Sequence, residues 1–588
     1  MNQRRSHSDL LGQVHNRDVS ATLELIADLL KLAGVNQFRV RAYRNAGRTV
    51  DALPEEVHTM IARGDDLDAL PSIGKDLAGK IADIATTGST ALLDELKRDT
   101  PPSLADLLRL PGLGPRRVRT FHDALGIENL EQLHRALKDG SIEKLPGFGA
   151  RTVTKLLREI EAKPAAEGRI SRAIATQYAE PLLNYLLGLS SVKNAAIAGS
   201  YRRWRGTVGD LDIVARSLAP ADVTSAFVQY REVSEVISRC STRSTVRLRS
   251  GLQVDLRAVP PESYGSALVY FTGSKAHNIA IRRMAQGMGL LVNEYGVFKH
   301  ERRLAGGSEE EVYEAIGLPW IPPEIREDRG ELAAALSGSL PDLIEPGDIL
   351  GDLHAHTTAT DGHNSLEEMA AAAMTRGYSY LAITDHSRHL TVAHGLNEKY
   401  LARQIKQIDA INRRKRGFTL LRGIEVDILE DGALDLPDRI LKRLDIVVGA
   451  IHSGFNRSRK AQTERILQAF DNPHIAVLSH PTGRLIGTRE PYDIDMESVM
   501  RKAHDKGIML ELNAHPERLD LTDTHCRMAR DMGVMISIGT DAHSVADLDF
   551  MRLGIGQARR GWLEAGHVAN TLTLTNLLNT TRRGRMPA

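Results

Sequence analysis

One stretch in the first half of the chain combines a Gly-Ser turn, a basic segment and two aspartates: Ala198-Gly199-Ser200-Tyr201-Arg202-Arg203-Trp204-Arg205-Gly206-Thr207-Val208-Gly209-Asp210-Leu211-Asp212-Ile213-Val214. The apolar residues that precede the turn and those that follow Gly209 are typical of strands. Strand side chains two residues apart share a face, so Asp210 and Asp212 lie about 6–7 Å apart along it. Two such carboxylates repel each other unless a cation lies between them. The pattern therefore predicts a site for Mg²⁺ or Mn²⁺.

A third acidic residue follows in a second predicted strand. Residues 246–259 alternate apolar and polar side chains in one run, and Asp255 lies inside it. Gly199 and Ser200 add a backbone N–H and a hydroxyl that suit phosphate oxygens. An Asp-x-Asp pair alone is also compatible with a solvated strand end. The turn before the pair and the third aspartate after it favour the metal site.

The order of these motifs resembles the palm of the nucleotidyltransferase superfamily. Gly199-Ser200, Gly209-Asp210-Leu211-Asp212 and Asp255 carry this resemblance, and Tyr270-Phe271-Thr272-Gly273-Ser274 makes the chain similar to family X DNA polymerases. The resemblance implies that the three aspartates are catalytic and hold two Mg²⁺ or Mn²⁺ ions, one for the primer 3′-hydroxyl and one for the incoming deoxynucleoside triphosphate.

The same resemblance implies a set of nucleotide-binding residues. Ser200 and Arg203 hold the β- and γ-phosphates, Tyr270 and Phe271 lie against the sugar, and Asn278 and Arg282 face the minor-groove edge of the nascent pair. The full set is Ser200, Arg203, Gly209, Tyr270, Phe271, Gly273, Ser274, Asn278 and Arg282.

The overall composition gives no sign of a nucleic-acid partner. The chain has 588 residues with 76 Lys+Arg, 75 Asp+Glu and 42% hydrophobic residues, which predicts at least three globular domains and only local basic surfaces. Cys240 and Cys526 match no zinc or disulfide spacing, and we expect both to be buried as small apolar residues in a reducing cytoplasm. No apolar run approaches the ~18 residues of a membrane span.

The first quarter of the chain is expected to be helical, with Leu23, Ile26, Leu29, Leu30 and Leu32 on one buried face. Three repeats that begin with Leu-Pro, at Leu70, Leu110 and Leu145, resemble helix-hairpin-helix motifs. One copy alone is compatible with a plain turn between packed helices, but three copies favour glycine turns that approach DNA phosphates without reading the sequence. The predicted contacts are Gly74, Gly112, Gly114, Gly147 and Gly149, and Ser72 departs from the pattern in the first copy.

The resemblance to family X polymerases extends to this helical region, which is similar to their lyase domain followed by the fingers. It implies that Lys80 forms a Schiff base with a 5′-deoxyribose phosphate and that Arg39 and Tyr43 hold the 5′-phosphate. The alternative for Lys80 is an ordinary solvated helix lysine.

From Gly351 onward, short apolar strands alternate with helices. The strands expected at 380–384, 419–424, 446–451, 476–479, 509–512 and 535–538 predict a βα barrel. Nearly every strand ends in a residue type that binds metals: His354, His356, Asp361, His386, Glu425, His452, His480, Asp541 and His543. One buried histidine is commonly explained by hydrogen bonding in a core, but nine such residues suffice for three metal ions.

These nine residues resemble the pattern of the PHP (polymerase and histidinol phosphatase) domain. The resemblance implies a trinuclear phosphoesterase with Mn²⁺ or Zn²⁺. In bacterial and archaeal family X polymerases, the implied activity is a Mn²⁺-dependent 3′→5′ exonuclease with processing of abasic sites and blocked 3′ ends. A very similar proline-rich string, here residues 318–330, joins the thumb to this domain in those proteins.

The sequence therefore predicts a multidomain α+β and α/β protein with helical helix-hairpin-helix domains, a nucleotidyltransferase palm and a distorted β/α PHP barrel. The expected parts are a lyase-like domain at 1–90, fingers at 91–165, a palm at 166–260, a thumb at 261–318, a linker at 319–345 and the PHP metallophosphoesterase domain at 346–588. The expected protein is a monomeric, cytoplasmic, nucleoid-associated DNA polymerase that fills gaps in repair. The alternatives are a DNA-binding phosphoesterase with an inactive palm and a small-molecule phosphatase.

Overall fold

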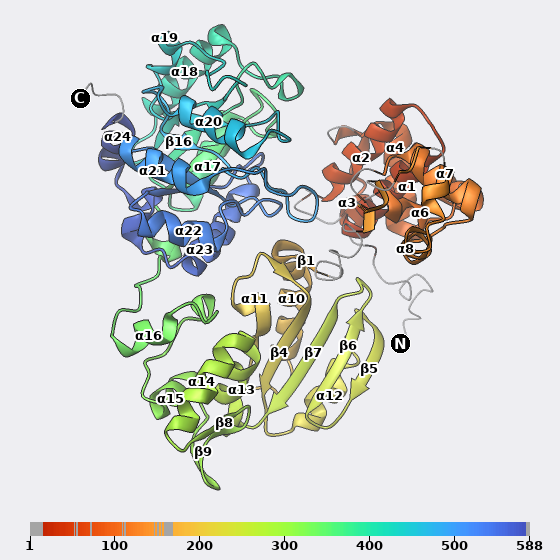
Figure 1. The fold of residues 1–588 in the computed structure, drawn as a ribbon, viewed down its shortest axis with the longest axis vertical. Helices are drawn as coiled ribbons and strands as arrows, with labels where there is room; N and C mark the ends of the chain where they lie inside the picture. Colours follow the sequence, from red (N-terminus) through yellow and green to blue (C-terminus); the bar gives the residue numbers. More distant parts are fainter. Residues whose placement is uncertain are drawn as a thin grey trace. The chain divides into compact units, whose positions relative to one another are not determined.

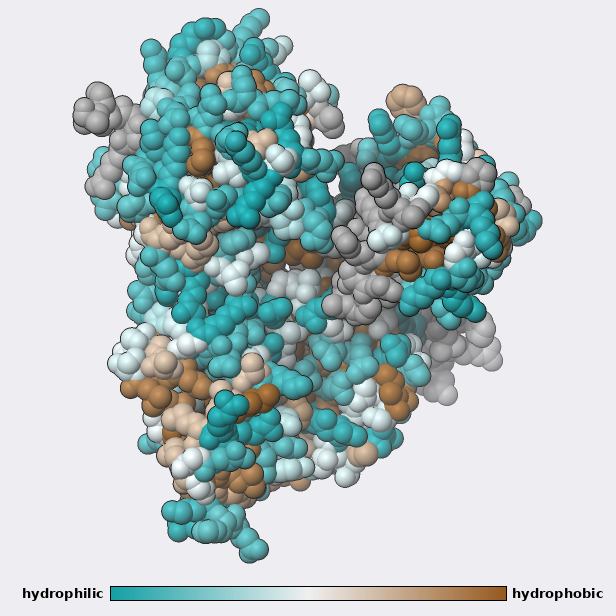
Figure 2. All heavy atoms as spheres, viewed as in Figure 1, coloured by the Kyte–Doolittle hydropathy of each residue, from teal (hydrophilic) through white to brown (hydrophobic). Residues whose placement is uncertain are grey.

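The computed structural model describes residues 14, 16–51, 53, 57–70, 73–108, 110, 113–145, 147–149, 152–154, 156–157 and 169–583. The chain forms two compact units, residues 1–167 and 168–588 (Figure 1). Among the described residues, no helix is both long and apolar enough to cross a membrane. The face drawn in Figure 2 is largely hydrophilic, with hydrophobic side chains in small groups.

The first unit is helical. Its helices are α1 (Asn16–Leu32), α2 (Gln37–Asp51), α3 (Val57–Arg63), α4 (Lys75–Thr87), α5 (Ala91–Asp99), α6 (Leu104–Leu107), α7 (Pro115–Leu125) and α8 (Leu130–Lys138), with 3-10 turns η2 (Leu67–Ala69) and η3 (Ile142–Lys144). Leu23, Ile26 and Leu29 are fully buried, and Leu30 and Leu32 nearly so. The predicted buried face of α1 is therefore confirmed.

The second unit begins with a palm built on a five-stranded sheet in the order β2-β4-β7-β6-β5. Its elements are β1 (Ile170–Ser171), α10 (Arg172–Leu187), β2 (Asn194–Ile197), α11 (Gly199–Arg202), β3 (Thr207–Val208), β4 (Asp210–Arg216), α12 (Pro220–Phe227), β5 (Val233–Arg239), β6 (Arg243–Leu248) and β7 (Gln253–Val259). Strands β4 and β7 pair in parallel, and the other pairs are antiparallel. Helices α10 and α12 share one hydrophobic core with the sheet.

Two expectations about the palm were wrong. The run 246–259 is not one strand, because a turn at Gly251 with φ +82° separates β6 from β7 and folds them into an antiparallel hairpin. The alternation of side chains continues through the turn, so the pattern alone did not mark it. Cys240 is exposed between β5 and β6, whereas Cys526 is buried as expected.

The thumb follows with η5 (Pro261–Ser263), α13 (Tyr264–Thr272), α14 (Lys275–Gly287), a sheet of β8 (Leu291–Asn293), β9 (Gly296–Lys299) and β10 (Arg302–Ala305), and α15 (Glu309–Ala315). The segment expected as a linker contains η6 (Pro323–Ile325), α16 (Glu331–Leu336) and η7 (Pro346–Asp348). It is packed rather than extended, because Ile321, Ile325 and Ala335 belong to the hydrophobic core of the thumb.

A buried ion-pair network fastens this connector to the thumb and the palm. Arg326 is fully buried, and its guanidinium donates to both carboxylate oxygens of Glu309 at 2.8 and 3.3 Å. Arg202 of the palm donates to the same carboxylate at 2.7 Å through each of two nitrogens. Burial by itself would raise the pKa of Glu309, but Arg326 and Arg202 hold it far below its ordinary value.

From Gly351 onward, the described part of the chain forms a parallel βα barrel, as the sequence predicted. Its strands are β11 (Gly351–Ala355), β12 (Tyr380–Ile383), β13 (Thr419–Arg422), β14 (Glu425–Asp427), β15 (Val448–Ala450), β16 (Val477–Leu478), β17 (Met509–Asn513) and β18 (Ile536–Gly539). They form two sheets, β11-β12-β13 and β14 to β18. Single parallel bridges from His386 to Glu425 and from Ala355 to Ala542 join the sheets and close a distorted barrel.

Helices surround this barrel (Figure 1). They are α17 (Leu366–Thr375), α18 (Glu398–Asn412), α19 (Asp438–Leu441), α20 (Arg459–Ala469), α21 (Met496–Lys506), α22 (Asp523–Asp531), α23 (Met551–Arg560) and α24 (Leu574–Arg583), with 3-10 turns η8 (Thr391–Ala393), η9 (Asp547–Phe550), η10 (Ala565–His567) and η11 (Ala569–Thr571).

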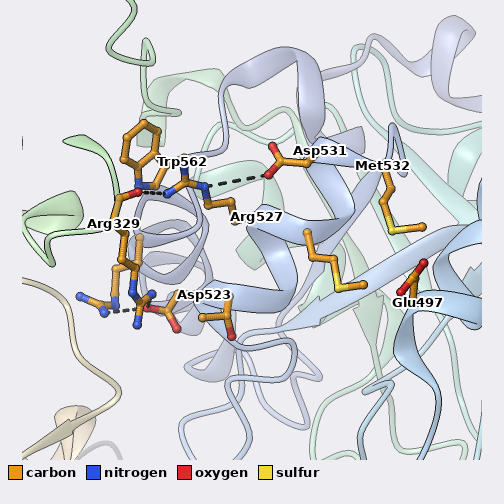
Figure 3. Close-up of a pocket in the computed structure, with 10 residues that line it drawn as sticks. Arg329, Glu497, Asp523, Arg527, Asp531, Met532 and Trp562 are labelled. Carbon is orange, nitrogen blue, oxygen red and sulfur yellow. Dashed lines mark hydrogen bonds and ion pairs between the residues drawn. The ribbon is translucent and has the colours of Figure 1, made fainter. Parts of the chain in front are cut away.

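The barrel packs directly against the palm and the connector. A β-carbon added at Gly556 of α23 would lie 2.1 Å from the indole of Trp204, so only glycine fits beneath this ring. Arg560 donates to the backbone carbonyl of Arg203 at 2.5 Å and to Glu327 at 3.0 Å. Arg329 and Arg560 also meet at Asp523, beside a cavity of about 450 Å³ (Figure 3).

The Glu309 network predicts a large stability effect. Glu309→Ala leaves the Arg326 charge buried and unpaired, and we expect the second unit to lose about 3–5 kcal/mol of unfolding free energy. Urea unfolding followed by circular dichroism measures the loss. Glu310→Ala, an exposed acid on the same turn of α15, is the matched control and should change stability much less. Equal losses in the two variants would contradict the role of the network.

Candidate active sites

The palm brings three predicted aspartates to one end of two adjacent strands. Asp212 of β4 lies beside Asp255 of β7 in register, and Asp210 lies beside Gln253. Burial raises the pKa of Asp212 to about 7, and the nearby Asp210 and Asp255 charges add to the shift. This carboxyl therefore carries a free-energy penalty for ionisation that a bound cation would remove. The donor set fits divalent metal ions, which prefer carboxylate oxygens.

Neighbouring residues hold this carboxylate group in place. Thr245 and Gln253 donate to the two oxygens of Asp255 at 2.5 and 2.9 Å. Gly199, with φ +59°, opens helix α11 directly above Asp212, and a β-carbon at this position would lie 2.3 Å from Asp212 Oδ2. The glycine is required for both its backbone conformation and its small size. It lets the backbone turn come down onto the carboxylate.

Several of the predicted nucleotide-binding residues contact one another. The Ser200 hydroxyl is buried and has no hydrogen-bond partner among the described residues. Asn278 donates to the carbonyl of Tyr270 at 2.6 Å, and Arg282 donates to the carbonyl of Asn278 at 3.2 Å. The rings of Tyr270 and Phe271 meet edge to face at 5.1 Å. Ser274 caps α14 by accepting from the backbone N–H of His277.

Arg203 is engaged by protein groups. Its side chain is 13% exposed, and its guanidinium donates to Glu327 at 3.1 Å and to the carbonyl of Thr272. A β-carbon at Gly273 would lie 3.2 Å from the same guanidinium, and one at Gly209 would lie 3.1 Å from that of Arg169. The geometry therefore places Arg203 beside Gly273, with its Nε and one terminal nitrogen engaged by Glu327 and by the Thr272 carbonyl. Its predicted phosphate contact remains a prediction.

In the first unit, Gly74 and Gly114 are the N-caps of α4 and α7. A β-carbon at Gly74, Gly114 or Gly149 would meet nothing within 4 Å, so the backbone there is open to a partner. Gly147 has φ +88°, a conformation that glycine adopts readily. Gly112 lies outside the described residues. The described glycines have the exposed backbone that a phosphate contact requires, and their role in DNA binding remains a prediction.

Lys80 and Tyr43, the predicted lyase and phosphate-binding residues, lie in different surroundings. Lys80 pairs with Asp76 one turn earlier on α4, at the edge of a cavity of about 360 Å³. Tyr43 is only 2% exposed and its hydroxyl is buried, whereas Arg39 on the same helix is exposed. The structure therefore does not bring Tyr43 and Arg39 together on the surface. The phosphate contact of Arg39 and Tyr43 and the lyase role of Lys80 remain predictions.

The barrel gathers the nine predicted ligands at the C-terminal ends of its strands. Among the described residues, groups of three or more such side chains with ligand atoms within 4.8 Å of one another form only here. The groups are His356, Asp361, His386 and His543; His354, His356 and Asp541; and His386, Glu425 and His452. His480 contacts Glu425 at 3.1 Å. The structure thus joins all nine residues into one centre.

The charges of this centre depend on one another. Burial would raise the pKa of Glu425, but His386, His452 and His354 hold it well below its ordinary value. The pKa of His386 rises to about 10 although burial opposes this, because Glu425 and Asp361 face it. Burial and the neighbouring His543 and His386 lower that of His356 to about 3. The carboxylates therefore hold protons on some histidines, and metal binding would release those protons.

Two buried atoms in this centre are placed to bind a cation. His356 Nδ1 and Asp361 Oδ1 face each other at 3.9 Å, and neither has a hydrogen-bond partner in the described part of the chain. Buried polar atoms are normally hydrogen-bonded or bound to an ion. The residues present therefore fit metal binding at this position.

Two positioning residues escaped the sequence analysis. A carboxylate oxygen of Glu511 on β17 is hydrogen-bonded to His354 Nδ1 at 2.6 Å. The same side chain accepts from the backbone N–H of His480 at 2.7 Å. Asp427 faces His452 Nδ1 at 2.7 Å. Both acids orient a histidine whose other ring nitrogen faces the centre. For Glu511 the available signal was an acid inside the otherwise apolar run from Met509 to Leu512.

A basic cavity of about 460 Å³ lies where the palm meets the loops that follow β16 and β17. Five arginines line it together with Glu490 and Asp523: Arg205, Arg329, Arg484, Arg489 and Arg560. Arg484 donates to the backbone carbonyls of Arg518 and Leu519, and Arg489 donates to that of Gly483. The near-neutral composition predicted that any basic surface would be local, and this cavity is such a surface.

Comparisons with known protein families match four parts of the chain. The DNA polymerase beta thumb matches residues 267–327, a helix-hairpin-helix domain 14–90, a SAM-like helix-hairpin-helix tandem 104–162 and the PHP domain 352–515. The chain is 38% identical over 96% of its length to the DNA polymerase/3′-5′ exonuclease PolX of Bacillus subtilis, covering 99% of that protein.

Shorter relatives match a third of the chain. A probable phosphatase of Caldanaerobacter subterraneus is 31% identical over 34% of this chain and 77% of its own length. A probable phosphatase of Thermoanaerobacter sp. is 32% identical over 34% of this chain and 80% of its own length.

The fold and the two centres define a multidomain enzyme that joins a nucleotidyltransferase palm to a metal-binding PHP barrel. The chain belongs to the family X DNA polymerases, in the branch that carries helix-hairpin-helix domains and a C-terminal PHP domain. The resemblance that the sequence predicted is confirmed. Membership also implies divalent metal ions at both centres.

Glu511 offers a test of the barrel centre. Glu511→Gln keeps the shape but removes the charge that faces His354, and we expect metal affinity to fall about 10–100-fold. Metal content after dialysis against a graded chelator series measures this. Glu517→Gln changes an exposed acid that follows the same strand and should retain metal like the wild type. Unchanged affinity in Glu511→Gln would contradict the positioning role.

Proposed function

We propose that this protein is a template-directed DNA polymerase that fills short gaps during base excision repair or end joining, with a 3′→5′ exonuclease in its PHP barrel. The observation that carries the proposal is the pairing of Asp212 with Asp255 beneath the Gly199 turn, together with the nine-residue centre in the barrel. The full-length similarity to a protein named for both activities supports it.

In the palm, Asp210, Asp212 and Asp255 would hold two Mg²⁺ or Mn²⁺ ions. When bound, such ions neutralise triphosphate charge and lower the pKa of a primer hydroxyl. Thr245 and Gln253 keep the Asp255 carboxylate aimed at this position. The backbone N–H groups that open α11 and the unpaired Ser200 hydroxyl are placed to donate to phosphate oxygens.

In the barrel, the nine ligands would hold up to three Mn²⁺ or Zn²⁺ ions, because imidazole-rich sites favour these metals over Mg²⁺. Glu511 and Asp427 orient His354 and His452, and Arg518 lies 3.3 Å from Asp541. The substrate would be the 3′ end of a DNA strand. Cleavage at abasic sites and removal of blocked 3′ ends belong to the same chemistry.

Gapped or primer-template DNA is the proposed partner. The open glycine turns at Gly74 and Gly114 suit duplex phosphates, and the basic cavity lined by Arg205, Arg484 and Arg489 suits a strand that passes between palm and barrel. We further propose that the protein acts as a monomer on the nucleoid. A 5′-deoxyribose phosphate lyase would use Lys80, whose cavity also contains Asp76 and Asp83.

Two other functions fit part of the molecule. A DNA-binding phosphoesterase with an inactive palm would keep the barrel chemistry, and primer extension on gapped DNA separates it from the main proposal. A small-molecule phosphatase agrees with the names of the shorter relatives. The helix-hairpin-helix matches favour DNA over a small substrate.

The palm assignment predicts that Asp255→Ala abolishes nucleotide insertion on a gapped duplex, because the third metal-binding carboxylate is lost. Digestion of a 3′ end in Mn²⁺ should stay near normal, since Asp255 is not part of the barrel. Gel-based extension and degradation assays on the same preparation measure both activities. Retained insertion would refute the metal role of Asp255.

The assignment of the nuclease to the barrel predicts that changes to barrel ligands remove 3′-end digestion and leave nucleotide insertion intact. Degradation of a 3′ end should be strong in Mn²⁺ and weak in Mg²⁺, and the double variant His354→Ala, His356→Ala should lose it. Insertion should survive in either metal because the palm ligands are carboxylates. Loss of a labelled primer in Mn²⁺ is the measurement. Equal digestion by the wild type and the double variant would remove the nuclease from the barrel.

A further inference from the structure

A cavity of about 410 Å³ lies beside the barrel metal centre. None of the nine metal ligands lines this cavity, and neither do Glu511 and Asp427. One wall begins at Thr357, which directly follows His356, and another includes His394 and part of α18, in the segment that follows His386. The cavity therefore opens at the same strand ends that carry the metal ligands.

Helix α18 presents one of its faces to this cavity. Tyr400, Arg403, Gln404 and Gln407 all line it. Their spacing of three, four and seven residues places them on a single helical face. One wall of the cavity thus offers an aromatic ring, a cation and two amides.

Gln404 is the buried member of this face, with 2% exposure. Its side-chain nitrogen donates to the side chain of Asp385. Its side-chain oxygen is buried and has no hydrogen-bond partner among the described residues. An unsatisfied buried acceptor costs about 1–3 kcal/mol, and an N–H donor in the cavity would remove that penalty.

Asp385 connects the cavity to the metal centre. It accepts from Thr357 and Thr360, which lie on the loop that carries Asp361, and it directly precedes His386. Gln404 is therefore held by the same carboxylate that positions the loop of a metal ligand. A ligand that contacts Gln404 would be separated from the metal ligand His386 by one hydrogen-bonded residue, Asp385.

The exposed members of the face suit a nucleotide. Tyr400 is 54% exposed although it is a large aromatic residue, and stacking of a base on an aromatic ring contributes about 1–3 kcal/mol. Arg403 is exposed one turn further along and can pair with a phosphate. An N–H donor, a flat ring and a phosphate together describe a nucleotide.

We propose that this cavity binds the base of the nucleotide at the DNA 3′ end processed by the barrel. The base stacks on Tyr400 and donates an N–H to Gln404, while Arg403 holds a neighbouring phosphate. Each DNA base carries N–H groups, so one acceptor does not select a sequence. This inference rests on the proposed nuclease function and assigns its substrate site.

The test compares Tyr400→Ala with Tyr400→Phe, which keeps the ring, and with Tyr295→Ala, which removes an equally exposed tyrosine (56%) from the thumb. The substrates are single strands in Mn²⁺ that end in a normal 3′ nucleotide or in an abasic tetrahydrofuran residue. We expect Tyr400→Ala to lower kcat/KM about tenfold on the normal end and to match the wild type on the abasic end. The two control variants should behave like the wild type on both substrates.

Equal slowing on both ends, or no slowing on either, would overturn the inference. A second measurement does not depend on nuclease activity. Equilibrium dialysis of the full chain in chelator, with deoxyadenosine 5′-monophosphate as the probe, should show at least tenfold weaker binding in Tyr400→Ala. Binding that is unchanged in the variant, or that is equal for deoxyribose 5-phosphate, would also overturn it. If the wild type degrades neither end but the binding difference appears, the nuclease proposal fails while the base site stands.

Discussion

The buried carboxylate of Glu309 is the interaction on which the second unit depends most. It accepts from Arg326 and from the indole N–H of Trp320, both in the connector, and from Arg202 of the palm, 107 residues away, so the palm, the thumb and the connector meet at one acid. Removing one partner from such a network leaves an uncompensated buried charge, which is far more costly than the loss of a surface ion pair. Arg560 extends the frame to the barrel through Glu327 and the carbonyl of Arg203. One network of ion pairs and hydrogen bonds thus joins the palm and the barrel, which carry the two catalytic centres.

Crowded like charges are the second constraint, and the two centres meet it differently. The palm brings together three carboxylates, and burial together with their repulsion raises the pKa of Asp212. The barrel alternates histidines with acids, so carboxylates such as Glu425 are stabilised by imidazoles even before a metal binds. An all-oxygen site and an imidazole-rich site prefer different cations. One chain can therefore run two metal-dependent reactions with separate requirements.

Contacts with the thumb and the barrel explain why the connector is packed. Residues 318–330 contain prolines, which the sequence analysis read as a domain boundary, but Ile321 and Ile325 are core residues and Arg326 is fully buried. Proline stiffens the segment, and burial of its apolar side chains then holds the barrel against the thumb. The contact of Gly556 with Trp204 adds a second junction. A separation of polymerase and nuclease into independent bodies is not compatible with these contacts.

The sequence alone determined the chemistry of both centres and the family of the chain. Asp210 and Asp212 share a strand face, the barrel ligands follow apolar strands, and Leu23 to Leu32 form a helical stripe, because each pattern depends only on local spacing. The tertiary structure decided which side chains are paired, which are buried and which are exposed. Arg203 is occupied by Glu327, 124 residues away, Tyr43 is buried, Cys240 is exposed, and Glu511 reaches His354 across 157 residues. Such pairings and burials arise between distant segments, and no local spacing encodes them.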